Sequence, residues 1–336
     1  MASSPNHDPG ALLAKAHEIA EQVLFPDSLA IDQAGVVPAA QLQRLADAGF
    51  YGISTWCDAA TIAKVIEVLA GGSLTATFVW VQHLGAAAAA FNSAGPLRDE
   101  LADDLVAGRK RGGVAFAHML RPGTPLTVAE PQQDGTWVFD GVAPWVTGWG
   151  HIDVVHAAAR HDDDIVWALI DAVESPTLMS EHVDFAAMDA TQTRVLTFDN
   201  HVVPAERITK IDEYAVWKDT YRLGLRTNGS LALGVASRCC RLLDDSAFFG
   251  ELNLLRDRLN QIAAEDTQLL SAARAEASLF AVRAATALVA ATGGNAVMMS
   301  AHAQRLMREA MFVVVQGQTP MIKAAMLDQL AGDRVP

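Results

Sequence analysis

The stretch that decides the fold runs from Gly293 to Ile322 and reads GGNAVMMSAHAQRLMREAMFVVVQGQTPMI. The paired glycines at its start end a long alanine-rich helical pattern, because glycine commonly closes a helix and stabilises its interior poorly. A second helical segment follows around Arg308, and an apolar run then extends from Phe312 to Val315. A polar turn, QGQTP at 316–320, comes next. The stretch therefore predicts two helices joined by a glycine loop and followed by a turn.

Composition limits the classes of protein that this chain can belong to. Its 336 residues are enough for two or three domains, and 51% of them are hydrophobic, which predicts a folded chain with a substantial core. The formal net charge is −14. Nucleic-acid binding needs clustered lysine and arginine, so we expect no nucleic-acid partner. We interpret the short basic cluster at 109–111 as charge at the end of a helix.

The chain also carries few signals for membranes, metals or disulfides. No apolar run approaches the roughly 20 residues of a membrane span, and the first ten residues, MASSPNHDPG, lack the features of a signal peptide. Cys57, Cys239 and Cys240 give neither a disulfide framework nor a metal-ligand spacing. We therefore expect a cytoplasmic protein with reduced thiols, no metal and no membrane partner.

The pattern changes from helix to strand and back to helix, which is typical of a segregated α+β architecture. Helical patterns cover 11–24, 38–49, 59–70, 73–91, 97–108 and 252–290, and strand patterns cover 114–117, 137–139, 154–159, 165–170 and 195–198. Pro26 is expected to stop the first helix. His83 lies in the wholly apolar segment 73–91, so we expect it to be buried and to donate to a backbone carbonyl.

Several stretches together resemble the acyl-CoA dehydrogenase family. They are the segment from Val37 to Ile53, DGVAPWVTG at 140–148, TFDNHVVPAE at 197–206, ALGVA at 232–236, and the glycine loop and turn of 293–322. The resemblance extends from about residue 11 to residue 330. It implies an N-terminal helical domain (1–111), a central antiparallel β-domain (112–210) and a C-terminal four-helix-bundle domain (211–336).

The resemblance also implies an FAD cofactor. Trp145 matches the tryptophan that stacks on the flavin, and Thr147 matches the hydroxyl that hydrogen-bonds to it; on residue type alone they are a core tryptophan and a strand threonine. Gly293 and Gly294 match a loop that contacts the FAD of a neighbouring subunit. Phe116 and His118 lie in a less well matched flavin segment, where the histidine is either a proton donor or a half-exposed strand residue.

Two departures concern the pyrophosphate and the catalytic base. The family's Arg-x-x-Phe-Gly arginine, which pairs with the cofactor pyrophosphate, is missing before Phe249-Gly250, and Asp244 and Asp245 lie upstream. Ungapped counting places Gly317 at the usual glutamate position, with Gln316 beside it, and Gly224 occupies the second position that the family uses. We interpret Glu309 as structural. The catalytic residue therefore stays unknown.

The function that the resemblance implies is FAD-dependent α,β-dehydrogenation of an acyl-CoA-like thioester in lipid metabolism. Two alternatives follow from the missing glutamate: a non-catalytic subunit of a heteromeric acyl-CoA dehydrogenase, or a flavin-dependent monooxygenase on the same fold. The family's shared flavin site implies a homodimer or a homotetramer, or a heteromer with a second family member. Apolar residues of the 293–322 stretch, such as Val297, Met298 and Met299, favour association.

Overall fold

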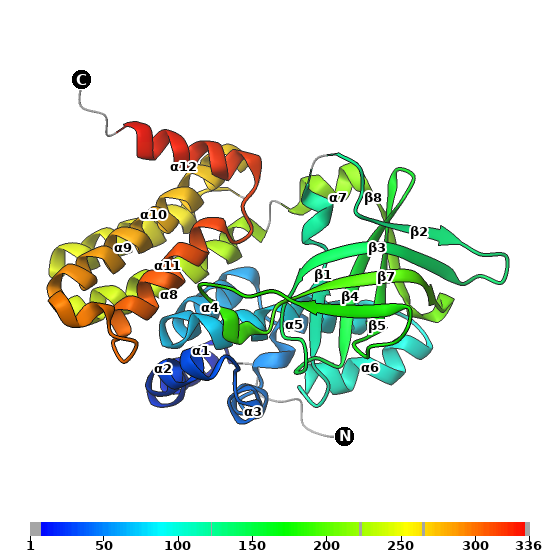
Figure 1. Ribbon diagram of the computed structural model, residues 1–336, viewed down its shortest axis with the longest axis horizontal. Helices are drawn as coiled ribbons and strands as arrows, with labels where there is room; N and C mark the ends of the chain where they lie inside the picture. Colours follow the sequence, from blue (N-terminus) through cyan, green and yellow to red (C-terminus); the bar gives the residue numbers. More distant parts are fainter. Residues whose placement is uncertain (1–7, 122, 222–223, 264–265, 333–336) are drawn as a thin grey trace.

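A computed structural model describes residues 8–121, 123–221, 224–263 and 266–332. Helices from both ends of the chain lie on one side of the molecule and a β-sheet on the other (Figure 1). The helix–strand–helix order predicted from the sequence is therefore confirmed.

The N-terminal third is helical, as predicted. Its elements are α1 (Pro9–Ile19), η1 (Ala20–Leu24), α2 (Phe25–Ala34), α3 (Ala39–Asp47), η2 (Phe50–Thr55), α4 (Ala59–Gly72), α5 (Leu74–Asn92) and α6 (Pro96–Val106). The predicted stop at Pro26 is wrong. A π-helical turn carries the chain from α1 into α2, and Pro26 lies directly after it, near the start of α2, so the helix passes the proline through a local change in its hydrogen bonding rather than ending there. His83 is buried; its Nε2 lies 3.0 Å from the Leu105 carbonyl oxygen, as predicted.

The middle of the chain forms one eight-stranded sheet. Its strands are β1 (Gly112–Ala115), β2 (Thr127–Pro131), β3 (Trp137–Val146), β4 (Val154–His161), β5 (Asp164–Asp171), β6 (Leu178–His182), β7 (Arg194–Val203) and β8 (Ile208–Glu213). The strand order is β6-β7-β3-β2-β4-β5-β8, with β1 paired to β4. The sheet is mixed rather than wholly antiparallel, because β4 pairs in parallel with β1 and β2. Neither pair is joined by a hairpin, so no tight turn imposes an antiparallel direction.

The C-terminal third returns to helices. They are α7 (Tyr214–Thr220), α8 (Gly224–Leu243), α9 (Ser246–Gln261), α10 (Thr267–Thr292), η7 (Gly293–Val297), α11 (His302–Val315) and α12 (Pro320–Gly332). The predicted continuous helix over 252–290 is wrong, since the chain breaks after Gln261. Asp266 explains the restart: its side chain accepts from the Leu269 N–H as the N-cap of α10.

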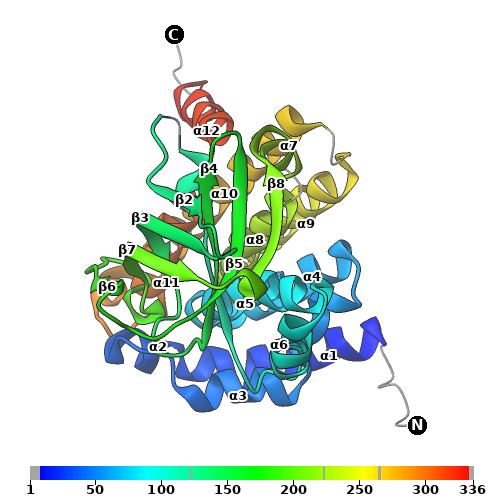
Figure 2. The ribbon, with the colours of Figure 1, turned by 90° about the vertical axis from the view of Figure 1, so that its right-hand side faces the viewer.

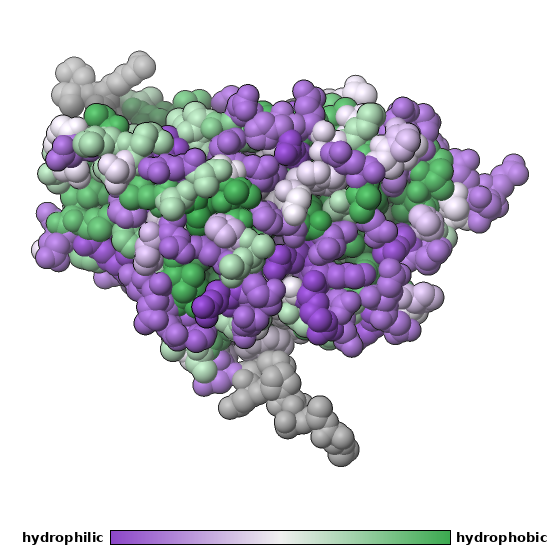
Figure 3. Space-filling model, turned by 60° about the horizontal axis from the view of Figure 1, so that its bottom comes forward, coloured by the Kyte–Doolittle hydropathy of each residue, from purple (hydrophilic) through white to green (hydrophobic). Residues whose placement is uncertain are grey.

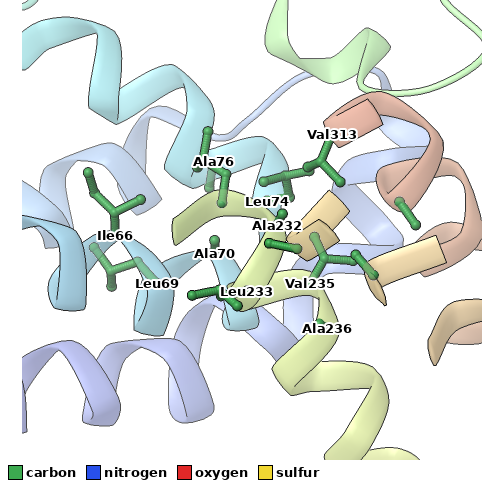
Figure 4. Close-up of a cluster of buried hydrophobic side chains, with 14 of the residues drawn as sticks. Ile66, Leu69, Ala70, Leu74, Ala76, Ala232, Leu233, Val235, Ala236 and Val313 are labelled. Atoms are coloured by element: carbon green, nitrogen blue, oxygen red, sulfur yellow. The ribbon is translucent and has the colours of Figure 1, made fainter. Parts of the chain in front are cut away.

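The N-terminal and C-terminal helices share one hydrophobic core. Its closest contact is between α4 and α8 (Figure 4). A Cβ atom at Gly234 would lie 2.6 Å from the Ala70 Cβ and 2.9 Å from the Gly71 nitrogen. Only glycine fits there, which explains the glycine of the 232–236 stretch. The sheet has a core of its own around Phe139 and Phe198. The residue limits of the three domains stay a prediction.

Two helices are long and apolar enough to cross a membrane by length and composition alone, Leu74–Asn92 and Thr267–Val297. Core helices of soluble proteins pass the same test, so this is weak evidence. Both helices contribute residues to the shared core, which accounts for their apolar composition.

Candidate functional site

Trp145 is presented to the surface by a distortion of β3. The register of β3 against β7 shifts between Ala143 and Val146, and Trp145 has a φ of +68°. This left-handed conformation is rare for a bulky residue. The side chain is 47% exposed, and its ring centroid lies 5.6 Å from that of Phe185. The bulge therefore supplies an exposed aromatic surface at the end of the strand.

Thr147 follows on the same strand end but is buried. Its hydroxyl lies 2.9 Å from the Thr193 hydroxyl, which lies 2.8 Å from the Thr191 hydroxyl. Thr191 in turn donates to the Met188 carbonyl oxygen at 2.7 Å. The Thr147 hydroxyl is thus part of a chain of hydrogen bonds inside the protein and would have to exchange a partner to bind a flavin.

Phe116 lies just before a short helical turn, η3 (Ala117–Leu120), and His118 lies within that turn. Phe116 packs into an aromatic cluster, with its ring centroid 5.8 Å from Trp167 and 6.2 Å from Trp217. His118 is 3% exposed, and its Nε2 donates to the Ala158 carbonyl oxygen at 3.1 Å. Burial lowers the pKa of His118 to about 4. The imidazole is therefore neutral at pH 7 with its N–H in use, and its role toward a cofactor stays a prediction.

Gly293 and Gly294 form an exposed loop in η7, at the end of α10. Gly293 has a φ of +68°, and a Cβ atom at either glycine would meet no atom within 4 Å. The loop lies on the side of the helices that faces away from the sheet (Figure 1, orange). Among the described residues no hydrogen bond or ring contact joins this loop to Trp145, and a joint role of the two in one flavin site stays a prediction.

The positions expected for a catalytic base do come together. Gln316 ends α11, and its Nε2 lies 3.4 Å from the Asn228 Oδ1. A Cβ atom at Gly317 would lie 3.1 Å from the Asn228 Nδ2. Gly224 is one helical turn before Asn228 on α8, and residues four apart share a helix face. Gln316, Gly317 and Gly224 therefore border one place, around Asn228.

A buried arginine that the sequence interpretation missed lies at the same place. Arg274, on α10, is 1% exposed and donates to the Ser278 hydroxyl. One of its terminal nitrogens lies 3.2 Å from the Val313 carbonyl oxygen, 3.3 Å from the Gln316 carbonyl oxygen and 3.4 Å from the Gln316 Oε1. The sequence does carry a signal for this residue, because Arg274 interrupts a stripe of alanines on the buried face of the helix.

Tyr221 connects this arginine to the sheet. Its ring centroid lies 5.9 Å from Phe116 and 5.7 Å from Trp217, and its hydroxyl lies close enough to the Asn228 side chain for Asn228 to affect the pKa of Tyr221. Burial raises the pKa of Tyr221, against the opposing effects of Asn228 and the Arg274 charge. The helix α7, which ends just before Tyr221, lies at the same end of the molecule as α12 (Figure 2). We call the group Arg274, Ser278, Tyr221, Asn228 and Gln316 the Arg274 centre.

The remaining acidic candidates have structural contacts. Glu309 is 3% exposed and forms an ion pair with Arg305, four residues earlier on α11; burial raises the pKa of Glu309. Asp245 caps α9 by accepting from the Ala247 N–H at 2.8 Å, which explains an aspartate in this segment. Within the described ranges, no group of three or more His, Cys, Asp or Glu side chains could hold a metal ion.

Comparison with solved structures defines the fold. No family model matches the chain, and no curated protein matches it. Butyryl-CoA dehydrogenase from Megasphaera elsdenii is similar over 99% of both chains, with a TM-score of 0.81 and 18% identity. Glutaryl-CoA dehydrogenase from Mycobacterium smegmatis, in complex with FADH2, is similar over 98% of this chain and 96% of its own, with a TM-score of 0.74 and 14% identity.

A third similar structure is an oxygenase. Dibenzothiophene monooxygenase from Paenibacillus sp. A11-2 is similar over 97% of this chain and 98% of its own, with a TM-score of 0.73 and 15% identity. The chain thus has the acyl-CoA dehydrogenase fold, as the sequence motifs predicted. At these identities the likeness establishes the fold, and it leaves the chemistry to the residues of the site.

Proposed function

We propose that this protein is an FAD-dependent oxidoreductase that acts on an acyl-CoA-like small molecule. The convergence of Gln316, Gly317 and Gly224 on Asn228 carries the proposal. Two segments that are 88 residues apart in the sequence meet at one place beside the aromatic cluster of the sheet. The fold and the exposed ring of Trp145 support it further.

The bound FAD would supply the hydride acceptor. Trp145 would cover the flavin with its exposed ring and exclude water from it, and Thr147 would bind the ring system after exchanging its contact with Thr193. The Arg274 centre would orient the substrate through amide and hydroxyl groups. That centre contains no carboxylate among the described residues, so it would not itself supply the usual base for removing an α-proton.

The missing base predicts little dehydrogenation of simple acyl-CoA thioesters by this chain alone, because a positioned base contributes about 10²–10⁴-fold in rate. The structure indicates which substitution to glutamate is best placed to supply the missing base. A Gly317→Glu side chain would be strained at φ +58° and crowded by Asn228. A Gln316→Glu carboxylate would face Arg274, which would lower its pKa. A side chain at Gly224 would meet open space, so Gly224→Glu should raise activity most.

The flavin part of the proposal is tested by a visible absorption spectrum of the purified chain. We expect weak but real FAD binding, with flavin that is easily stripped. Trp145→Ala should lower flavin occupancy, whereas Val142→Ala, at a partly exposed position on the same strand, should not. A chain that shows no flavin absorption after incubation with excess FAD would contradict the flavoenzyme proposal.

A flavin-dependent monooxygenase is the second candidate, and two observations favour it. The structure is similar to dibenzothiophene monooxygenase, and oxygen insertion needs no base at the substrate α-carbon. Oxygen consumption with reduced flavin and no dehydrogenation by Gly224→Glu would favour this candidate over a dehydrogenase.

We also propose association through the C-terminal helices. Large apolar side chains are exposed there, namely Leu254, Leu269, Val297, Met298, Met299, Met311, Val315, Met321, Leu327 and Leu330. On the face shown in Figure 3, apolar side chains also gather at the left, over the helical part of the molecule. A second copy covering them gives a homodimer or homotetramer. A monomer of 35.8 kDa in light scattering would contradict this, and solubility only on co-expression with a second family member would indicate a heteromer.

A further inference from the structure

Among the described residues three arginines are almost fully buried, and one of them differs from the others in having no carboxylate partner. The exposed fractions are 4% for Arg238, 2% for Arg305 and 1% for Arg274. Arg238 is paired with Glu21, and Arg305 with Glu309. Arg274 forms no ion pair with any residue in the described part of the chain. Burying a charge costs several kcal/mol, so an uncompensated guanidinium at the most buried of the three positions needs an explanation.

The contacts that Arg274 does make leave it incompletely satisfied. Its three contacts with Val313 and Gln316 oxygens are 3.2–3.4 Å long, whereas a guanidinium binds a carboxylate at about 2.7–2.9 Å. Its Nε is buried with no hydrogen-bond partner among the described residues, as is that of Arg305, so the difference between the two arginines is the missing carboxylate. The Val313 and Gln316 carbonyls belong to the end of α11. All the carbonyls at such a helix end together carry only about half a negative charge. Burial lowers the pKa of Arg274 to about 10, so it stays charged at neutral pH.

The side chains around Arg274 favour a ligand with a negative charge. Tyr221 has a hydroxyl, and Asn228 and Gln316 have amide groups, all of which can donate hydrogen bonds. All three are half-buried, so each side chain is partly exposed to solvent near the buried guanidinium. An entering anion would meet donors there and no carboxylate of the Arg274 centre to repel it.

We propose that the Arg274 centre binds a carboxylate group of the substrate. The carboxylate replaces the long contacts of the guanidinium with a charge-assisted pair, and Asn228 and Tyr221 donate to its oxygens. The centre lies where the positions for a base converge, so the carboxylate is held close to the reacting carbons. This inference rests on the proposed function only in assigning the carboxylate to the redox substrate; carboxylate binding itself needs no flavin.

The test is ligand-observed NMR or calorimetry on the full chain, with butyrate as the probe. Butyramide is the neutral isostere, and inorganic phosphate is a second anion. We expect butyrate to bind with a dissociation constant of about 1 mM and butyramide and phosphate to bind at least tenfold more weakly. Arg274→Met should weaken butyrate binding at least tenfold. Arg283→Met removes an exposed arginine of the same helix and should leave binding unchanged.

Asn228→Ala provides a second variant if Arg274→Met does not fold, and it should weaken butyrate binding severalfold. Equal binding of butyrate and butyramide, equal binding of phosphate, or no binding of butyrate would each overturn the proposal. A visible spectrum of the same samples separates the two proposals. Butyrate binding without flavin would leave this inference standing and contradict the flavoenzyme, and flavin binding without butyrate binding would do the reverse.

Discussion

The two ends of α11 hold buried arginines in opposite states. Near its start, Arg305 contacts Glu309 and lies 3.4 Å from the His302 Nδ1; we call these three residues the Arg305 centre. At its end, the last carbonyls of α11 contact Arg274 of α10. Both guanidiniums are at most 2% exposed, yet only the first has a carboxylate.

The difference shows that burial alone does not define the role of a charged residue. The Arg305 centre lies within one helix, and the charges of Arg305 and Glu309 compensate each other in the folded chain, although the Arg305 Nε and one Glu309 oxygen have no hydrogen-bond partner among the described residues. The Arg274 centre draws its side chains from α8, α10, the end of α11 and Tyr221, and it has donors in excess. A complete pair stabilises a structure, whereas an incomplete one is available to a ligand.

The largest effect should come from breaking the complete pair. Glu309→Gln leaves Arg305 buried without a counter-charge, and we expect a loss of about 3–5 kcal/mol in the free energy of unfolding. Chemical denaturation at a fixed protein concentration measures it. Glu276→Gln is the control, since Glu276 pairs with Arg258 on the surface, where such a pair contributes under about 1 kcal/mol. Equal losses in the two variants would remove the distinction between a buried and an exposed pair.

Completing the Arg274 centre should have the next largest effect. Gln316→Glu places a carboxylate beside Arg274, and a hydrogen bond to a charged group contributes about 1.5–3 kcal/mol. We therefore expect the free energy of unfolding to rise and butyrate binding to be lost. Gly317→Ala, next to it, should lower stability instead because of the left-handed φ at that position. A Gln316→Glu variant that is less stable than the wild type would show that Arg274 cannot pair there.

Removing the unpaired arginine should change stability less than removing Glu309. Arg274→Met loses the contacts with Ser278 and Val313 but also relieves a buried, uncompensated charge. These effects oppose each other, so we expect a change within about 2 kcal/mol. Denaturation of Arg274→Met and Glu309→Gln in parallel makes the comparison. If Arg274→Met is the less stable of the two, Arg274 is chiefly a structural residue.

The smallest expected effect is a pH dependence confined to the Arg305 centre. Burial, together with Arg305 and Arg238, lowers the pKa of His302 to about 4. The unfolded chain therefore takes up this proton first, and stability falls as the pH decreases from about 6.5 toward 4. The side chain is only partly buried, so the slope should stay below about 1.4 kcal/mol per pH unit.

His302→Gln should flatten this part of the pH profile, and Arg274→Met should leave it unchanged. Other buried histidines add the same slope to every variant, so the difference from the wild type isolates His302. Denaturation midpoints between pH 4.5 and 7 provide the measurement. An unchanged slope in His302→Gln would show that His302 is protonated normally in the folded chain.

The sequence alone predicted the α+β class and the order of helical and strand regions, because hydrophobic periodicity and turn residues act locally. Its motifs predicted the acyl-CoA dehydrogenase fold, which the solved structures confirm. Local signals also explain its errors. Pro26 was taken as a stop, but a π-helical turn before it carries the helix on, and the break after Gln261 was hidden in an apolar stripe.

The sequence also determined the Arg305–Glu309 pair, since a spacing of four residues on a helix brings two side chains together wherever that helix packs. Only the tertiary structure decided the Arg274 centre. Arg274, Asn228 and Gln316 are separated by more than forty residues along the chain, and no local pattern relates them. The packing of α8, α10 and α11 places a guanidinium beside the positions where the family resemblance implies a carboxylate and this sequence has none, because the position of a side chain between helices depends on how those helices meet.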